Sequence, residues 1–272
     1  MTVPRMISGL VLMFITIGLV IAGPFWTALG IFVLFGTAQI EFAQLAAKQG
    51  YRASGELMLA WLLLFLADRL LPEKGLLEPG ISLLMLITFT WTIIRYRQGT
   101  TNAIVGFALT LTGSIYIGWS AAHLLGLRTF DPDGIFWFFT AWLATVMADS
   151  CAYIVGMNFG RNKLIPDISP GKTWEGYIGG IICTILIIGA LMLLWQRLGG
   201  SSALTPIHGM FIGGLAATVG PIGDLGISVL KRYANVKNTS NLIPGHGGVL
   251  DRIDALLISC LVSYYYLTLV VL

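Results

Sequence analysis

The chain has 272 residues, of which 56% are hydrophobic and only 11% are charged. Soluble globular proteins carry about 25% charged residues, so this composition excludes a sizeable soluble domain. The mean hydropathy of +0.84 and the modest net charge of +3 indicate a protein embedded in a lipid bilayer, and we expect no nucleic-acid partner.

Nine apolar stretches predict membrane-spanning helices, each of which needs about 20 residues to cross the hydrocarbon core. The third is short, and the count depends mainly on how residues 57–125 are divided. We predict an all-α polytopic transmembrane bundle of about nine spans. Residues 1–130 form N-terminal transmembrane helices, and residues 131–272 form a C-terminal transmembrane region whose loops are polar. The predicted spans are 6–22, 25–47, 57–71, 80–96, 102–125, 134–157, 176–197, 207–230 and 249–271.

The basic residues predict the orientation of these spans. If the N-terminus and every even-numbered loop lie on one side, that side receives twelve of the sixteen Lys and Arg residues and the other side four. Cytoplasmic loops are enriched in Lys and Arg, so we expect a cytoplasmic N-terminus in the inner membrane. Two polar segments, 149–176 and 220–254, then face the cytoplasm.

Asp149 and Asp224 are carboxylates inside apolar spans, where an ionised group is costly unless it meets a cation or a cavity. Asp149 lies in the sixth span, and the alternative for it is a polar residue that packs between helices. Asp224 lies among Gly220, Pro221, Gly223 and Gly226, a stretch that predicts a broken helix and a cation ligand at the break. The alternative for Asp224 is a simple proline kink beside a packing residue.

Asp251 and Asp254 begin the ninth span and share one helix face. Carboxylates at a helix N-terminus are stabilised by the helix dipole, which would account for one of them. Magnesium is usually held by one or two carboxylates together with substrate phosphates. We therefore expect Asp224 and Asp251 to bind Mg²⁺, with Asp254 and Asp149 as supporting ligands or ligands of a second cation.

Basic residues accompany these acids in the two polar segments, and a polyphosphate is the ligand that requires both metal and several cations. Alternatively, these basic residues only set the membrane topology and attract anionic lipids. The stretch "SPGKTWEG" is not a P-loop, because position 166 is proline where a glycine is needed and no strand is expected before it. The candidate cations are Lys172, Lys231, Arg232, Lys237 and Arg252.

These segments resemble the integral-membrane CDP-diacylglycerol synthases (phosphatidate cytidylyltransferases). The resemblance is carried by "DSCAY" at 149–153, "ISPGKTWEG" at 168–176, "PGHGG" at 244–248 and "LDRID" at 250–254, with Ser228 and Lys231-Arg232 between them. It covers roughly the last 45% of the chain by motif. One residue departs from the family pattern, since Asn238 stands where the family usually has aspartate.

The resemblance implies a Mg²⁺-dependent reaction of CTP with phosphatidic acid that gives CDP-diacylglycerol and pyrophosphate, and it makes a homodimer reasonable. Asp224, Asp251, Lys172, Lys231, Arg232, Lys237 and His246 would then be catalytic. No strong general base is required, because a phosphate monoester is largely ionised at pH 7. The residues expected to contact substrate are Ser169, Lys172, Ser228, Gly247, Gly248 and Arg252.

A membrane transporter with an intramembrane carboxylate cation site is the alternative from another class. The acids and bases gather at one membrane face, and the two halves of the chain lack a matching pair of interrupted helices. Both features favour the enzyme. A CDP-alcohol phosphotransferase is a second alternative, but its signature is absent from the sequence.

Overall fold

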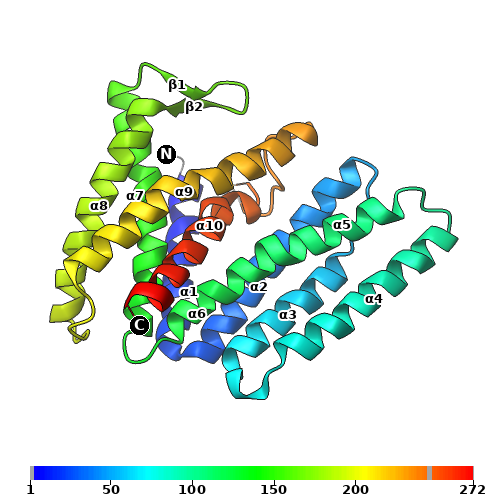
Figure 1. The fold of residues 1–272 in the computed structure, drawn as a ribbon. Coiled ribbons are helices and arrows are strands. Elements are labelled where there is room, and N and C mark those ends of the chain that lie inside the picture. Colours follow the sequence, from blue (N-terminus) through cyan, green and yellow to red (C-terminus); the bar gives the residue numbers. More distant parts are fainter. Residues whose placement is uncertain (1–2, 244–246, 272) are drawn as a thin grey trace. The chain divides into compact units, whose positions relative to one another are not determined.

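The computed structural model describes residues 3–243 and 247–271, with the backbone alone described for 3–8. Its long helices follow the predicted spans in order (Figure 1). They are α1 (Val3–Ala22), α2 (Pro24–Lys48), α3 (Gly55–Leu70), α4 (Leu77–Arg97), α5 (Ala103–Gly113), α6 (Ser120–Arg128), α7 (Gly134–Phe159), α8 (Trp174–Arg197), α9 (Pro206–Tyr233) and α10 (Leu250–Tyr266).

Short helical elements complete this set. A 3₁₀ turn, η1 (Pro72–Lys74), precedes α4. The π-helical residues η2 (Ser114–Trp119) join α5 and α6 into one run, and the π-helical η3 (Leu267–Val271) extends α10. The prediction of an all-α polytopic fold is confirmed.

Within the described residues, seven helical runs are long and apolar enough to cross a membrane. Two helices are not among these seven runs: α1, whose described apolar part is Gly9–Ala22, and α3, which has only 16 residues. At about 1.5 Å per residue, α3 is about 24 Å long, which is less than the roughly 30 Å of a bilayer core. The protein is thus multi-pass, and nine complete crossings are not confirmed.

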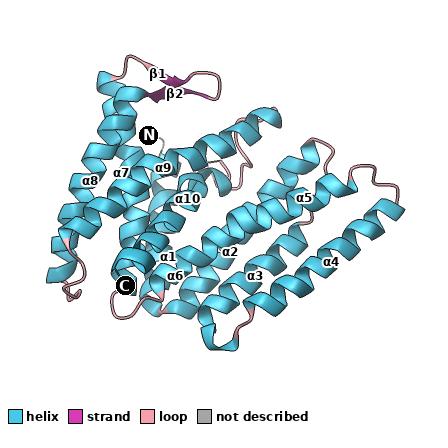
Figure 2. Ribbon diagram, in the orientation of Figure 1, coloured by secondary structure: helices cyan, strands magenta, loops and turns pink. Residues whose placement is uncertain are grey.

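Two local predictions are wrong. Residues Lys163–Ile165 (β1) and Ser169–Thr173 (β2) form a two-stranded antiparallel hairpin where we expected loop, so a strand does precede "PGKT" (Figure 2). In addition, α9 continues through Pro221 without the predicted break. Proline is tolerated inside membrane helices because neighbouring groups satisfy the backbone that it frees.

The chain forms two compact units, and each is described by itself. The first, unit 1, contains Met1–Leu125 and Leu230–Arg252, and the second, unit 2, contains Gly126–Val229 and Ile253–Leu272. In unit 1, α2 packs against α1, α3 and α5, and α3 packs against α4. Its buried aromatic centre includes Trp61 and Phe65 of α3 beside Ala122 of α6.

In unit 2, α7 and α8 pack along much of their length, and the hairpin joins their ends (Figure 1). Small residues permit this approach, since a Cβ on Gly180 would lie 2.9 Å from the Cβ of Ala152. The side chain of Thr173 caps α8 by accepting a hydrogen bond from the Gly176 amide at 3.2 Å. The hairpin is therefore held at a fixed point, the start of α8.

Candidate active site

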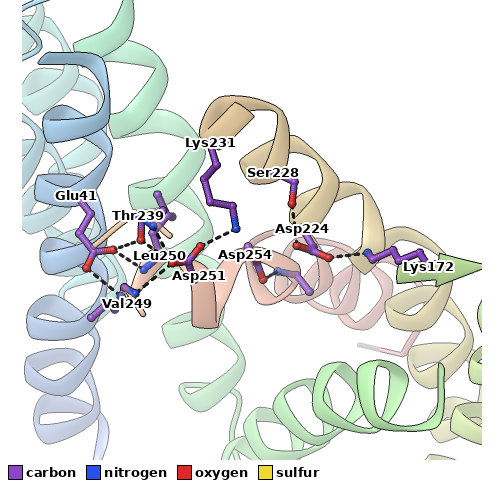
Figure 3. A network of polar contacts seen from close by, with 12 residues as sticks. Glu41, Lys172, Asp224, Ser228, Lys231, Thr239, Val249, Leu250, Asp251 and Asp254 are labelled. Atoms are coloured by element: carbon purple, nitrogen blue, oxygen red, sulfur yellow. Dashed lines mark hydrogen bonds and ion pairs between the residues drawn. The ribbon is translucent and has the colours of Figure 1, made fainter. Parts of the chain in front are cut away.

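In unit 2, Lys172 and Asp224 form an ion pair. Lys172 lies in β2, one residue before the cap of α8, and Asp224 lies in α9, with 2.6 Å between Nζ and Oδ2 (Figure 3). The two side chains are 25% and 28% exposed. The Ser228 hydroxyl, one turn further along α9, donates a longer bond of 3.4 Å to the other Asp224 oxygen. This partly open ion pair and the neighbouring serine bring together Lys172, Asp224 and Ser228, all of which the sequence singled out.

The position of Lys172 is set by Glu175 in the first turn of α8. Its carboxylate accepts hydrogen bonds from the backbone amides of Arg161 (3.0 Å) and Asn162 (3.2 Å). The Asn162 side-chain amide donates a further bond at 2.8 Å. Glu175 thus ties the entry of the hairpin to the start of α8, and Lys172 lies on the strand between them.

A cavity of about 430 Å³ opens beside Lys172 within unit 2. Asp149 of α7, Ser169 and Lys172 of the hairpin, and Ala217 and Pro221 of α9 contribute to its lining. Asp149 is exposed rather than enclosed by neighbouring helices. The structure therefore brings Asp149, Ser169 and Lys172, three predicted site residues, to one cavity.

Asp254, in the first turns of α10, lies at a close crossing with α9 in the same unit. A Cβ on Gly223 would overlap the Asp254 carbonyl oxygen, so the two backbones touch there. Asp224 follows Gly223 directly and occupies a position neighbouring Asp254 (Figure 3). The Asp254 residue is 8% exposed, and one of its carboxylate oxygens accepts a bond from the Ala255 amide at 2.8 Å.

In unit 1, Lys231 and Asp251 form a second ion pair, also at 2.6 Å, with side chains only 13% and 5% exposed. The second oxygen of Asp251 accepts bonds from the backbone amides of Thr239 (2.8 Å) and Gly248 (3.1 Å). Gly247 has a φ of 86°, a left-handed conformation that favours glycine. The glycine pair thus turns the backbone so that an amide faces Asp251.

Glu41, in the C-terminal half of α2, is a residue that the sequence reasoning missed. It is 3% exposed, and its two oxygens accept three hydrogen bonds from the segment between α9 and α10 and one from Leu250, the first residue of α10 (Figure 3). A signal was present, because Glu41 is a carboxylate within a predicted span, the feature that identified Asp149.

Most of the remaining predicted residues lie at the surface of the protein. Arg232, Lys237, Asn238 and Arg252 are exposed. His246 lies outside the described residues. Among the residues that the structure does describe, no three or more His, Cys, Asp and Glu side chains gather closely enough to hold a metal ion alone.

Magnesium nevertheless fits the oxygen donors that are present, because it commonly takes only one or two carboxylates and completes its shell with phosphate oxygens and water. Asp224 is partly open to solvent, and its partner Lys172 is a side chain that a phosphate could engage. The donor set thus suits a cation that arrives with a phosphorylated substrate.

Comparison with known proteins agrees with this chemistry. A profile of the "Cytidylyltransferase family" matches residues 3–270. The phosphatidate cytidylyltransferase of Bacillus subtilis (strain 168) is 32% identical over 272 residues, which cover 97% of each chain. The enzyme of the same name from Haemophilus influenzae is 42% identical over 153 residues, covering 53% of this chain and 52% of the relative.

A third relative, the phosphatidate cytidylyltransferase of Mycobacterium tuberculosis (strain H37Rv), is 36% identical over 145 residues. That match covers 53% of this chain and 42% of the mycobacterial protein. Since the family profile extends over nearly the whole sequence, from the first helix to the last, this chain belongs to the cytidylyltransferase family.

Proposed function

We propose that this chain is a phosphatidate cytidylyltransferase that makes CDP-diacylglycerol from CTP and phosphatidic acid. A phosphate oxygen of phosphatidic acid attacks the α-phosphorus of CTP, and a new phosphorus–oxygen bond forms. The bond from the α-phosphorus to the oxygen that bridges to the β-phosphate breaks, and pyrophosphate leaves with that electron pair. The attacking phosphate is largely ionised at neutral pH, so no strong base is needed.

The observation that carries this proposal is the presence of two Lys–Asp pairs, Lys172–Asp224 and Lys231–Asp251, in a chain with so few charges. All four residues belong to segments that resemble the synthase family. Phosphoryl-type transfer depends chiefly on positioning and on neutralising negative charge, and Lys with metal-bound Asp provides both.

We assign Asp224 and Asp251 as Mg²⁺ ligands, with Asp254 and Asp149 as supporting ligands. When bound, the cation would neutralise charge on the triphosphate and on the departing pyrophosphate. Asp224 and Asp251 are each paired with a lysine, Lys172 and Lys231 respectively. Asp224 and Asp251 would hold the cation, while Lys172 and Lys231 would bind phosphate oxygens, so each member of both pairs would keep a partner of opposite charge.

The other residues bind substrate in this proposal. Lys172, Lys231, Arg232 and Lys237 contact phosphate oxygens, and Ser169, Ser228 and Arg252 help to orient the substrates. The backbone at Gly247 and Gly248 lets the triphosphate approach closely, and His246 acts in the same segment. Exposed Asn238 can still donate or accept a hydrogen bond where the family usually has aspartate.

We also propose that the protein lies in the inner membrane as a homodimer, with its N-terminus and active site facing the cytoplasm. The unequal distribution of basic residues supports this orientation. A cytoplasmic site lets soluble CTP meet a lipid phosphate at the bilayer surface. Cysteine labelling from either side of sealed vesicles tests the orientation, and crosslinking in membranes tests the dimer.

The reaction itself is tested with purified protein in detergent. We expect pyrophosphate release that requires CTP, phosphatidic acid and Mg²⁺ together. Absence of pyrophosphate release with all three present would reject the synthase function, whereas release without phosphatidic acid would indicate a hydrolase.

A further inference from the structure

Glu41 of α2 contacts the described part of the segment that connects α9 to α10, which we call the α9–α10 loop (residues 234–243 and 247–249). One carboxylate oxygen accepts bonds from the Ser240 hydroxyl (2.6 Å) and the Val249 amide (2.9 Å). The other accepts bonds from the Thr239 hydroxyl (2.7 Å) and the Leu250 amide (2.9 Å). A residue about 200 positions away in the sequence therefore holds both the interior of this loop and its junction with α10.

All four partners donate to the Glu41 carboxylate, and two of them are backbone amides, which cannot accept a hydrogen bond. Glu41 is a member of neither the Lys172–Asp224 nor the Lys231–Asp251 ion pair. A buried carboxylate without its hydrogen bonds would be strongly unfavourable. Glu41 and the loop consequently stabilise each other.

Glu41 also substitutes for a cap at the start of α10. The first amides of a helix have no partner within the helix. Here the Val249 and Leu250 amides bond to Glu41, and the Gly248 amide bonds to Asp251. A Cβ on Gly248 would overlap the Thr239 hydroxyl and lie 2.5 Å from Glu41, so only glycine permits this packing.

The same loop supplies the support of Asp251. The backbone amide of Thr239, whose hydroxyl bonds to Glu41, donates to Asp251. Ile243 and Gly247 exchange two backbone hydrogen bonds, of 2.9 and 3.2 Å, which fix the backbone that leads into Gly248. Through these contacts, Glu41 fixes the backbone on which the position of Asp251 depends.

We propose that Glu41 is a positioning residue for catalysis: it anchors the α9–α10 loop and the first turn of α10, and so holds Asp251 and the Gly247-Gly248 backbone in their working geometry. This inference rests on the proposed function for its catalytic consequence. The anchoring of the loop by Glu41 is independent of that function.

The test uses Glu41→Gln in the full-length protein, because glutamine keeps the size of the side chain. The side-chain NH₂ of the glutamine would face the backbone N–H of Val249 or Leu250, so two donors would oppose each other and one hydrogen bond would be lost. We expect amide hydrogen exchange in 239–243 and 247–250 to accelerate by about tenfold or more, because local opening becomes easier. We expect kcat to fall by about 10²-fold, the effect of misplacing a catalytic group by about 1 Å. The KM for phosphatidic acid should change little.

Two further variants keep the test informative if Glu41→Gln proves unstable. Glu41→Asp retains both acceptor oxygens and should recover part of the protection and of kcat. Thr239→Val combined with Ser240→Ala removes two of the four donors from the loop side and should have a smaller effect in the same direction.

Gln39→Met provides the matched control. Gln39 lies two positions earlier on α2, is fully buried, and its side-chain amide has no hydrogen-bond partner among the described residues. Its substitution should leave exchange in the loop and kcat at wild-type values. Equal effects of Gln39→Met and Glu41→Gln would mean that any change in α2 suffices, and the proposal would be overturned.

The possible results separate the inference from the proposed function. Unchanged loop exchange in Glu41→Gln would overturn the anchoring, and accelerated loop exchange with wild-type kcat would overturn the positioning role. If the wild-type protein makes no CDP-diacylglycerol, the proposed function fails. Faster exchange in the variant would then still support the anchoring of the loop.

Discussion

The Lys172–Asp224 and Lys231–Asp251 pairs share a nitrogen–oxygen distance of 2.6 Å, yet their surroundings differ. The first joins a hairpin to a helix and leaves about a quarter of each side chain exposed. The second is nearly enclosed, and Thr239, Gly248 and, through the loop, Glu41 support it. The first pair is the more accessible to an incoming ligand, although the Lys172 nitrogen itself is buried, while the enclosed pair is held in place before the ligand arrives.

This difference has an energetic basis. Exposed ion pairs contribute about 0–1 kcal/mol to stability. Loss of one partner from a buried pair costs about 3–5 kcal/mol, because the remaining charge is left desolvated. Substitutions at the two pairs should therefore separate effects on catalysis from effects on folding.

Removal of Mg²⁺ with EDTA should have the largest effect on activity and little effect on the fold. We expect turnover to be lost and then restored when Mg²⁺ is added back. The thermal unfolding midpoint should stay the same, because lysines neutralise Asp224 and Asp251 without metal. Undiminished turnover in EDTA would contradict the assignment of these aspartates as metal ligands.

Asp251→Asn should lower kcat by about 10³-fold, comparable to the loss of a strong electrostatic group in an active site. The asparagine also leaves buried Lys231 without its anion, so the free energy of unfolding should fall by about 3 kcal/mol while the protein still inserts into membranes. Kinetic assays and thermal unfolding in detergent measure the two effects. Near-normal turnover would remove Asp251 from the metal site.

Lys172→Ala should lower kcat/KM by about 10²-fold, mainly through a higher KM for CTP, because a phosphate contact is lost. Its free energy of unfolding should change by about 1 kcal/mol or less, since the pair is partly exposed. Initial rates over a range of CTP concentrations check this result. A stability loss as large as that of Asp251→Asn would show that the two pairs do not differ as described.

Asn238→Asp should have the smallest effect. Asn238 is exposed and borders Gly247, where a Cβ on the glycine would lie 3.2 Å from the Asn238 Cγ. An added carboxylate should raise the apparent Mg²⁺ affinity by about tenfold or less, the equivalent of about 1.4 kcal/mol. Mg²⁺ titration of activity measures it, and an unchanged titration would make the position peripheral.

Much of the fold could be predicted from the sequence, because long apolar runs specify membrane helices whatever their partners. The hairpin could not, since strands of three and five residues containing Pro170 and Gly171 lack a clear alternating pattern. The break predicted in α9 was wrong because Pro221 and its neighbouring glycines permit close helix packing as well as interruption.

The candidate site was predicted as a set of residues without its contacts. Lys172 and Asp224 are 52 positions apart, and no local pattern indicates that they pair. Glu41 lies near none of the recognised motifs, so its link to the α9–α10 loop emerges only from tertiary packing. The individual roles of these residues remain predictions that the variants above test.

The most direct test of the central claim follows the fate of labelled CTP. We would incubate the purified protein with phosphatidic acid, Mg²⁺ and CTP labelled with ³²P at either the α- or the γ-phosphate. Cytidylyl transfer predicts that α-label enters the lipid fraction and that γ-label stays in water as pyrophosphate. Transfer of γ-label to lipid, or no label in lipid from either CTP, would contradict it.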